Sequence, residues 1–80
     1  MKNSEVEAIV LRAIRQALDN SHLGPADDFF GAGGDSILAV KVTSEVEERL
    51  GISLDTMGLY VAPTAAELAA LISAGNGEDE

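Results

Sequence analysis

The spacing of apolar residues at the start of the chain constrains the fold more than any other sequence feature. Apolar side chains recur there every three or four residues, at Val6, Ile9, Val10, Ala13, Ile14, Ala17 and Leu18. This period places them on one face of a helix, with the charged residues between them on the other face. We therefore expect an amphipathic helix over residues 4–18, opened by a capping box in which Ser4 is the N-cap and Glu7 the third helical residue.

Three further segments carry helical signals. Residues 36–50 place Ala39, Val42, Val46 and Leu50 on one stripe, and Gly51 follows as a stop. Residues 55–60 predict one short turn with Leu59 and Tyr60 inward, weakened by Gly58. Thr64 to Glu67 predict a second capping box and a final helix in which Leu68, Leu71 and Ile72 face the core. The fold class is therefore all-α, a bundle of three main helices and one short helix.

A long loop separates the first two main helices. Breakers follow one another from Asp19 to Pro25, and the next helix begins only after Gly34. Leu23, Phe29 and Phe30 are expected to pin this loop to the core, because each can bury a large apolar surface. Short carboxylates bond nearby backbone N–H groups, so Asp27 and Asp28 predict tight turns. A calcium loop is disfavoured, since the usual acidic spacing and terminal glutamate are missing.

Composition excludes several classes of function. Fourteen acidic residues against five basic ones give a net charge of −9, which disfavours nucleic acids and anionic membranes as partners. The chain has no cysteine and a single histidine, His22, so neither a thiolate nor a histidine metal centre is expected. The first residues lack the apolar core of a signal peptide, and no apolar run approaches about 18 residues. We expect one domain over residues 1–74, an acidic flexible tail over 75–80 and a cytoplasmic location.

The stretch from Gly31 to Leu38 carries the strongest functional signal. Two glycines, Gly33 and Gly34, lead to Asp35 as a helix N-cap and to Ser36 in the first helical turn. Backbone N–H groups lack partners at this end of a helix, and the dipole there is positive, so the position favours a phosphate ester.

Other uses of this serine are less consistent with the sequence. A hydrolase would need a base, the only histidine is in another loop, and the G-x-S-x-G motif is absent. A phosphate-binding loop would need a lysine beside its hydroxyl residue. A plain helix cap without function stays possible from these residues alone. The remaining functional interpretation is covalent attachment through the hydroxyl of Ser36.

Residues around Ser36 suggest a contact surface. Ile37 and Val40 fall outside the core stripe, on a face shared with Lys41 and Ser44. They either pack under the loop or meet a partner protein. Partner contacts with Ile37, Val40 and Lys41 are expected to be weak and salt-sensitive, because a modest, partly charged interface favours fast release.

Three motifs occur in a specific order along the chain: Asp27-Asp28-Phe29-Phe30, then Gly33-Gly34-Asp35-Ser36-Ile37, then Leu59-Tyr60-Val61-Ala62-Pro63-Thr64. In this order and spacing, the chain resembles the peptidyl carrier domains of nonribosomal peptide synthesis over residues 6–72. The resemblance implies a non-catalytic carrier with a four-helix, acyl-carrier-like fold. It also implies 4′-phosphopantetheine on Ser36, attached from coenzyme A by a phosphopantetheinyl transferase, with Asp35 and Gly34 part of the cofactor site.

The resemblance also implies the protein's working partners. The cofactor thiol would hold an aminoacyl or acyl group as a thioester and present it to adenylation, condensation, tailoring or thioesterase enzymes, from a carrier expected to be monomeric. One alternative is an acyl carrier protein of polyketide or fatty acid synthesis. Another class of alternative is an unmodified helical interaction module. Ala32 stands where the family usually has leucine, so Leu23 or Met57 is expected to fill the space.

Overall fold

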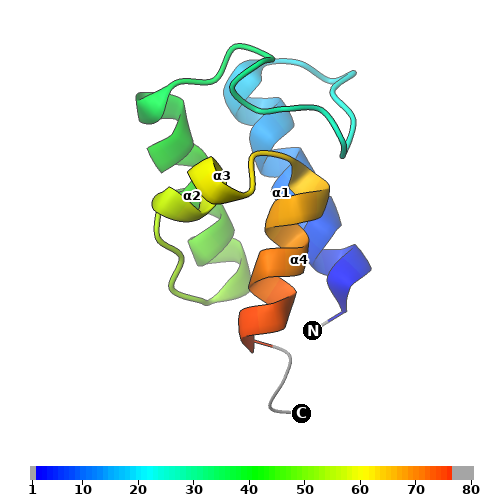
Figure 1. The fold of residues 1–80 in the computed structure, drawn as a ribbon, viewed down its shortest axis with the longest axis vertical. Coiled ribbons are helices and arrows are strands. Elements are labelled where there is room, and N and C mark those ends of the chain that lie inside the picture. The colour runs from blue at the N-terminus through cyan, green and yellow to red at the C-terminus, as the bar shows by residue number, and fades with distance from the viewer. Residues whose placement is uncertain (1, 77–80) are drawn as a thin grey trace.

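The computed structural model describes residues 2–76 and folds them into four helices (Figure 1). They are α1 (Asn3–Leu18), α2 (Ser36–Leu50), α3 (Met57–Val61) and α4 (Ala65–Asn76). Helix α1 packs against both α2 and α4, and the short α3 lies beside α4. The predicted all-α fold is confirmed, and the predicted first and second helices agree with the structure to within one residue.

The predicted capping box at the start of α1 is wrong, whereas at α4 the predicted Thr64 cap is confirmed and Glu67 bonds to the Thr64 hydroxyl rather than to its N–H. Lys2 is the N-cap of α1, and its carbonyl accepts bonds from the N–H groups of Glu5 and Val6, each at 3.1 Å. Ser4 therefore already lies inside the helix and cannot cap it. At α4, the N–H of Glu67 donates to Thr64 Oγ1 at 3.1 Å, and the Thr64 hydroxyl donates to Glu67 Oε1 at 3.2 Å.

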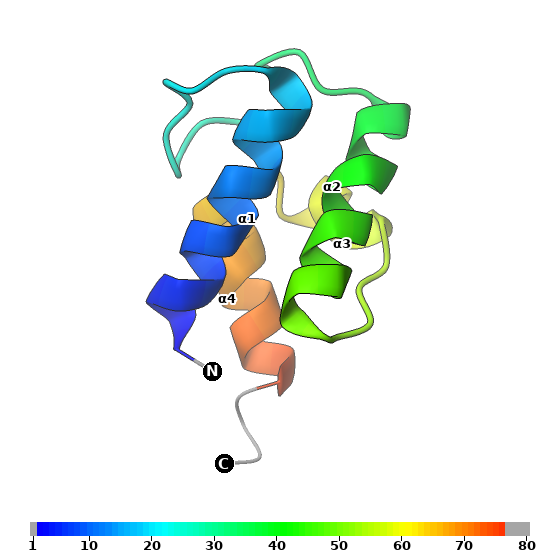
Figure 2. The same ribbon diagram turned by 180° about the vertical axis from the view of Figure 1, so that it is seen from behind.

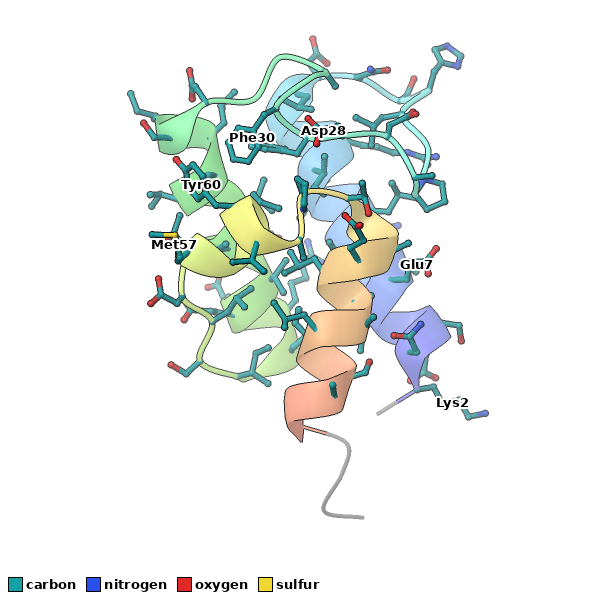
Figure 3. All side chains as sticks on the ribbon, in the orientation of Figure 1. Lys2, Glu7, Asp28, Phe30, Met57 and Tyr60 are labelled. Atoms are coloured by element: carbon teal, nitrogen blue, oxygen red, sulfur yellow. The ribbon has the colours of Figure 1, made fainter. Side chains whose placement is uncertain are left out.

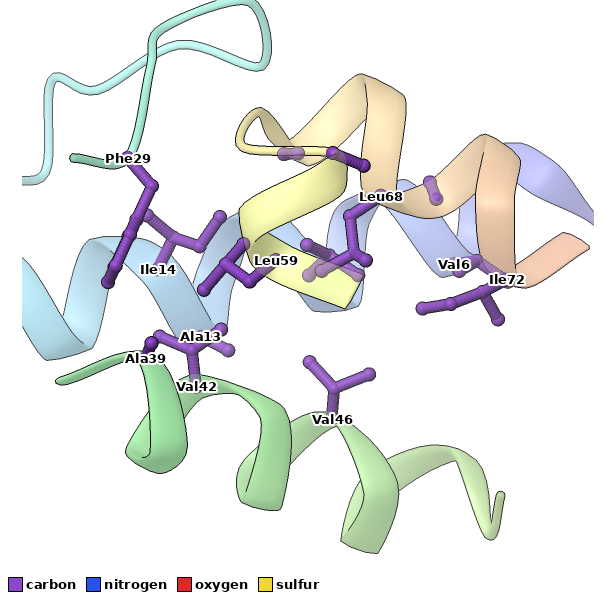
Figure 4. Packing of buried hydrophobic residues seen from close by; sticks show 14 of the residues in the cluster. Val6, Ala13, Ile14, Phe29, Ala39, Val42, Val46, Leu59, Leu68 and Ile72 are labelled. Carbon is purple, nitrogen blue, oxygen red and sulfur yellow. The ribbon is translucent and has the colours of Figure 1, made fainter. Parts of the chain in front are cut away.

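The core lies where α1, α2 and α4 meet (Figure 4). Its buried apolar side chains come from all four helices, from the α1–α2 loop and from the residue after α3; they are Val6, Val10, Ala13, Ile14, Leu23, Phe29, Ala39, Val42, Val46, Leu59, Ala62, Ala65, Leu68, Ala69 and Ile72. Most of the predicted stripe of each main helix is among them. The loop supplies Phe29, the largest fully buried side chain, so the loop is part of the core.

Two residues predicted to point inward do not. Leu71 is 43% exposed and Tyr60 is 46% exposed. Helix α3 is only five residues long, so it buries one side chain, Leu59, and covers only part of the flank of α4 on which Leu71 lies. The ring of Tyr60 packs instead on Phe30, with centroids 4.7 Å apart.

Helix α3 is attached to α2 through side chains. The hydroxyl groups of Thr43 and Thr56 are hydrogen-bonded at 3.1 Å, and the N–H of Leu54 donates to Glu47 Oε2 at 2.6 Å. Thr43 is buried and also donates toward the carbonyl oxygens of its own helix, a role that the apolar pattern did not predict. The connection therefore rests on a few polar contacts and on its apolar side chains Ile52, Leu54, Leu59 and Ala62.

The last helix bears on the predicted domain boundary. Helix α4 continues to Asn76, two residues beyond the predicted domain end at residue 74. Residues 77–80, the rest of the predicted tail, lie outside the described residues. The division into a carrier domain and a tail stays a prediction.

Candidate phosphopantetheine attachment site

Ser36 is the first residue of α2, and its side chain is exposed. The preceding residue, Asp35, has an extended backbone and is the N-cap, as predicted. Its Oδ1 accepts a bond from the N–H of Leu38 at 2.9 Å, and its carbonyl accepts one from Ala39 at 2.8 Å. The cap fixes where the helix begins and therefore keeps the exposed Ser36 in its first turn.

The first turn of α2 retains unused hydrogen-bond donors beside this hydroxyl. Asp35 satisfies the N–H of Leu38, but within residues 2–76 the N–H groups of Ser36 and Ile37 have no acceptor. The positive end of the helix dipole lies at the same place. A phosphate ester on Ser36 would therefore carry its negative charge where the backbone favours an anion, by about 0.3–1 kcal/mol at an exposed position.

The two positions before the cap require glycine for different structural reasons. Gly33 has a φ of +114°, a conformation that side chains with a Cβ rarely adopt. Gly34 has an ordinary φ, but a Cβ there would lie 2.3 Å from Cε2 of Phe29. Because the ring of Phe29 occupies the space of a side chain at position 34, Gly34 is required for packing. Sequence reasoning placed both glycines before the cap but missed this contact, which joins residues five apart in the loop.

The loop before Ser36 is tied to both α1 and the start of α4. Arg15 donates from Nε to the carbonyl of Leu23 at 2.7 Å. The N–H of Phe29 donates to the carbonyl of Pro63 at 2.7 Å, and Ala66 donates to that of Pro25 at 3.0 Å. These bonds connect the loop to α1 and to the start of α4, so the long loop that precedes Ser36 is fixed to the rest of the fold.

The predicted roles of the loop residues are largely confirmed. Asp27 accepts from the N–H of Gly24 at 2.7 Å, and Asp28 accepts from that of Gly31 at 2.5 Å. Phe29 is buried, Phe30 is half-buried against it edge-to-face, and Leu23 is buried and lines a hollow together with Ala32. Met57, the other candidate to fill that space, is 60% exposed and does not.

The residues expected to meet partners lie on the surface. Ile37 is 77% exposed and Val40 is 51% exposed, so neither packs under the loop. Met57 and Val61 of α3 are also exposed apolar side chains, and the sequence pattern did not single them out for this surface. Figure 3 shows Met57 below Tyr60 and Phe30 on the same side of the molecule. Lys41 is exposed one turn after Ile37, and it also lines a hollow between α1 and α2.

Within residues 2–76, no group of three or more His, Cys, Asp or Glu side chains is arranged to hold a metal ion. None of the helices in this part of the chain has the length and apolar character needed to cross a membrane. His22 is exposed, and its backbone N–H donates to Asn20 Oδ1 at 3.0 Å.

Comparison with known proteins identifies the family of this fold. Residues 5–72 match the family model described as phosphopantetheine attachment site, so the chain belongs to this family of non-catalytic carrier domains. Phosphopantetheine is the group that becomes attached to members of this family. The chain is a carrier domain of the kind found in peptide synthetases and their hybrids with polyketide synthases.

Individual relatives agree with the family. The chain is 37% identical over its whole length to a segment of malpibaldin synthetase from Mortierella alpina, and 39% identical over 88% of its length to a segment of tyrocidine synthase 3 from Brevibacillus parabrevis. It spans only 2% and 1% of these two relatives. Among solved structures, it is similar to BlmI, a type-II acyl carrier protein from Streptomyces verticillus involved in bleomycin biosynthesis. The TM-score is 0.87 and the identity 29%, with 91% of this chain and 88% of BlmI covered.

Proposed function

We propose that Ser36 is the attachment residue, and that the chain carries an aminoacyl or related acyl group as a thioester on 4′-phosphopantetheine in nonribosomal peptide or hybrid biosynthesis. One observation carries the proposal: an exposed serine hydroxyl opens α2, directly after a side-chain cap and beside unused backbone donors. The family match over residues 5–72 includes this position. The chain has no cysteine, so the thiol of such a carrier would come from the cofactor.

Each residue around the hydroxyl has a distinct part in this role. Asp35 holds the helix start, and the amides of Ser36 and Ile37 favour the phosphodiester. Gly34 lets Phe29 pack beneath the loop and thereby keeps Ser36 at the surface. When bound, the cofactor supplies a thiol that forms thioesters, so the protein's own contribution is to position and present it.

Attachment requires a transferase that uses coenzyme A. The Ser36 oxygen forms a bond to phosphorus, the pyrophosphate bond of coenzyme A breaks, adenosine bisphosphate leaves, and the hydroxyl proton passes to the transferase. The family resemblance suggests that Asp35, which is exposed beside Ser36, helps to position the magnesium ion in the transferase complex. Because coenzyme A is a cytoplasmic metabolite, this proposal places loading in the cytoplasm.

The partners in turn would be adenylation, condensation, tailoring or thioesterase enzymes. The exposed apolar side chains of Ile37 and Val40, with Met57 and Val61 of α3, support contacts near the serine, and Lys41 adds a charge at their edge. Contacts of this kind are small and favour fast release. The carrier is proposed to act as a monomer, which light scattering on the purified chain would test.

Intact mass spectrometry tests the attachment residue. The chain is incubated with coenzyme A, magnesium and a broad-specificity phosphopantetheinyl transferase, beside Ser36→Ala and the matched control Ser44→Ala, which alters an exposed serine of the same helix. We expect one phosphopantetheinyl group on the parent and on Ser44→Ala, and none on Ser36→Ala. A group on folded Ser36→Ala would overturn the assignment. Failure of the parent with two unrelated transferases would instead favour an unmodified interaction module.

A further inference from the structure

The basic residues of this acidic chain are concentrated on two helices. Four of the five, Arg12, Arg15, Lys41 and Arg49, belong to α1 or α2. Three of them line two adjoining hollows between these helices, which lie side by side in Figure 2. The hollows have volumes of about 250 and 260 Å³. We call them together the cationic groove, lined by Ala8, Ile9, Arg12, Ala13, Gln16, Ala17, Lys41, Glu45 and Arg49.

Most of the positive charge in the cationic groove is not neutralised. Glu45 pairs with Arg49, with Oε2 and Nε 2.6 Å apart. Arg12 and Lys41 are exposed and form no ion pair within residues 2–76. Three cations thus face one carboxylate in a chain whose net charge is −9. The groove is a positive surface on a molecule that otherwise repels acidic partners, so it selects where such a partner can bind.

The floor of the cationic groove is apolar and built mainly from small residues. Ala8, Ala13 and Ala17 follow α1 along the groove, with Ile9 beside them. Ala13 is buried and Ile9 is half-buried. Small side chains allow a partner's backbone or an aliphatic side chain to come close, while Arg12 and Lys41 stand at the rim. This arrangement fits a peptide segment with both apolar and acidic side chains, as in helix-in-groove recognition.

A protein segment suits this surface better than a nucleic acid. A phosphate polymer would meet the net negative charge of the whole chain beyond the groove, whereas a short segment need contact only the groove itself. We propose that the cationic groove docks an acidic, amphipathic segment of a partner protein, with carboxylates at Arg12 and Lys41 and an apolar side chain over Ala13.

The cationic groove shares only Lys41 with the surface proposed to meet partners near the serine. Its lining includes neither Ser36 nor the exposed apolar residues Ile37, Val40 and Met57. A partner held in the groove therefore leaves the serine open to a second enzyme. Such a contact tethers the carrier while Ser36 is used elsewhere, and it does not depend on modification of the serine.

A peptide titration tests the proposal directly. The probe is a synthetic helical peptide with one leucine stripe flanked by glutamates, and its control has glutamine at every glutamate position. NMR of the isotope-labelled full chain is expected to show shifts in backbone amides of residues 8–17 and 41–49. Arg12→Glu and Lys41→Glu are each expected to weaken binding about fivefold. Lys2→Glu makes the same charge change outside the groove and is expected to alter the affinity less than about twofold.

Several results would overturn the proposal. They are equal affinity for the glutamine peptide, equal weakening by Lys2→Glu and Arg12→Glu, or shifts confined to Ile37, Val40 and α3. Thermal unfolding followed by circular dichroism checks that each variant is folded, and Arg12→Gln replaces Arg12→Glu if the latter is not. Ser36→Ala is expected to bind the peptide as the parent does, so the outcome is independent of whether Ser36 is the attachment residue.

Discussion

Two connections border the surface near Ser36, and they are held to the rest of the fold in different ways. The first is the loop between α1 and α2 (residues 19–35), and the second is the segment that contains α3 (residues 51–62). The first connection uses backbone groups: Phe29 and Pro25 bond to the segment at the start of α4. The second is joined to α2 through the side chains of Thr43 and Glu47. The first also places Phe29 and Leu23 in the core, whereas the second places the smaller pair Leu59 and Ala62 there.

This difference separates two tasks of a carrier. The long loop ends at Ser36 and is fixed to the core, so it holds the proposed attachment residue in one place. Helix α3 exposes Met57 and Val61 and is fixed by fewer contacts, so it is the part of the surface that can adjust to different partners. Loop length alone would have suggested the opposite, because long loops are commonly the more mobile segments.

The largest effect is expected from removing the ring that fixes the first connection. Phe29→Ala should cost about 3–5 kcal/mol, because the side chain is fully buried and a cavity would remain. A domain of this size has a total stability of about 3–5 kcal/mol, so the variant should be largely unfolded at 25 °C. Urea unfolding followed by circular dichroism measures this. Phe30→Ala, at a half-buried neighbour, is the control, and an equal or greater loss there would contradict the account.

A smaller loss is expected from filling the space at position 34. Gly34→Ala should cost about 1–3 kcal/mol, because its Cβ would overlap the ring of Phe29. Phe29→Leu removes the ring atoms that overlap, so the double variant should lose less than the sum of the two single losses. Gly33→Ala is limited by φ and has no atom within 4 Å of its Cβ, so it should combine additively with Phe29→Leu. Equal behaviour of the two glycines in denaturant unfolding would disprove the packing explanation.

The side-chain bond that attaches α3 should contribute less again. Thr43→Val keeps the shape of the side chain but removes its bond to Thr56, so it should cost about 1 kcal/mol. Amide exchange in residues 57–61 should accelerate more than exchange in α4. Ser44→Ala, an exposed change on the next residue, should leave stability within about 0.5 kcal/mol. Unchanged exchange in α3 of the Thr43→Val variant would show that the bond does not hold the helix.

The smallest expected effect is a gain in stability from a substitution in the second connection. Gly58 lies inside α3, and a Cβ there would meet Leu54, Leu71 and Leu68 at 3.5–3.8 Å, which is ordinary contact. Gly58→Ala should therefore stabilise the protein by about 0.5–1 kcal/mol. Thermal unfolding measures the gain, and the same variant should slow amide exchange in α3. A loss of stability would mean that the packing around α3 is tighter than these distances indicate.

The sequence predicted those features that depend on local signals. The spacing of apolar residues predicted the main helices. Asp35 predicted the start of α2, because the carboxylate of an aspartate before a helix can accept a bond from the N–H of the third helical residue. Ser36 was singled out for the same reason. Short-range chemistry of this kind acts within one turn, so it can be read from neighbouring residues.

Features set by contacts between elements could not be predicted in this way. Nothing around Gly34 in the sequence shows that its missing Cβ leaves room for Phe29, nor that Thr43 reaches Thr56. Tyr60 and Leu71 were misplaced because their burial depends on how much of α4 a five-residue helix can cover. The N-cap at Lys2 was missed because its side chain makes no cap bond, so the residue type gave no signal.

The most direct test of the contrast between the two connections is hydrogen exchange of individual amides by NMR on the unmodified chain. The N–H groups of Phe29 and Gly34 in the loop should exchange about as slowly as those of Val42 and Val46 in the centre of α2. The N–H groups of Gly58 and Leu59 should exchange at least about tenfold faster. Exchange in α3 as slow as in α2, or loop amides faster than those of α3, would contradict the account.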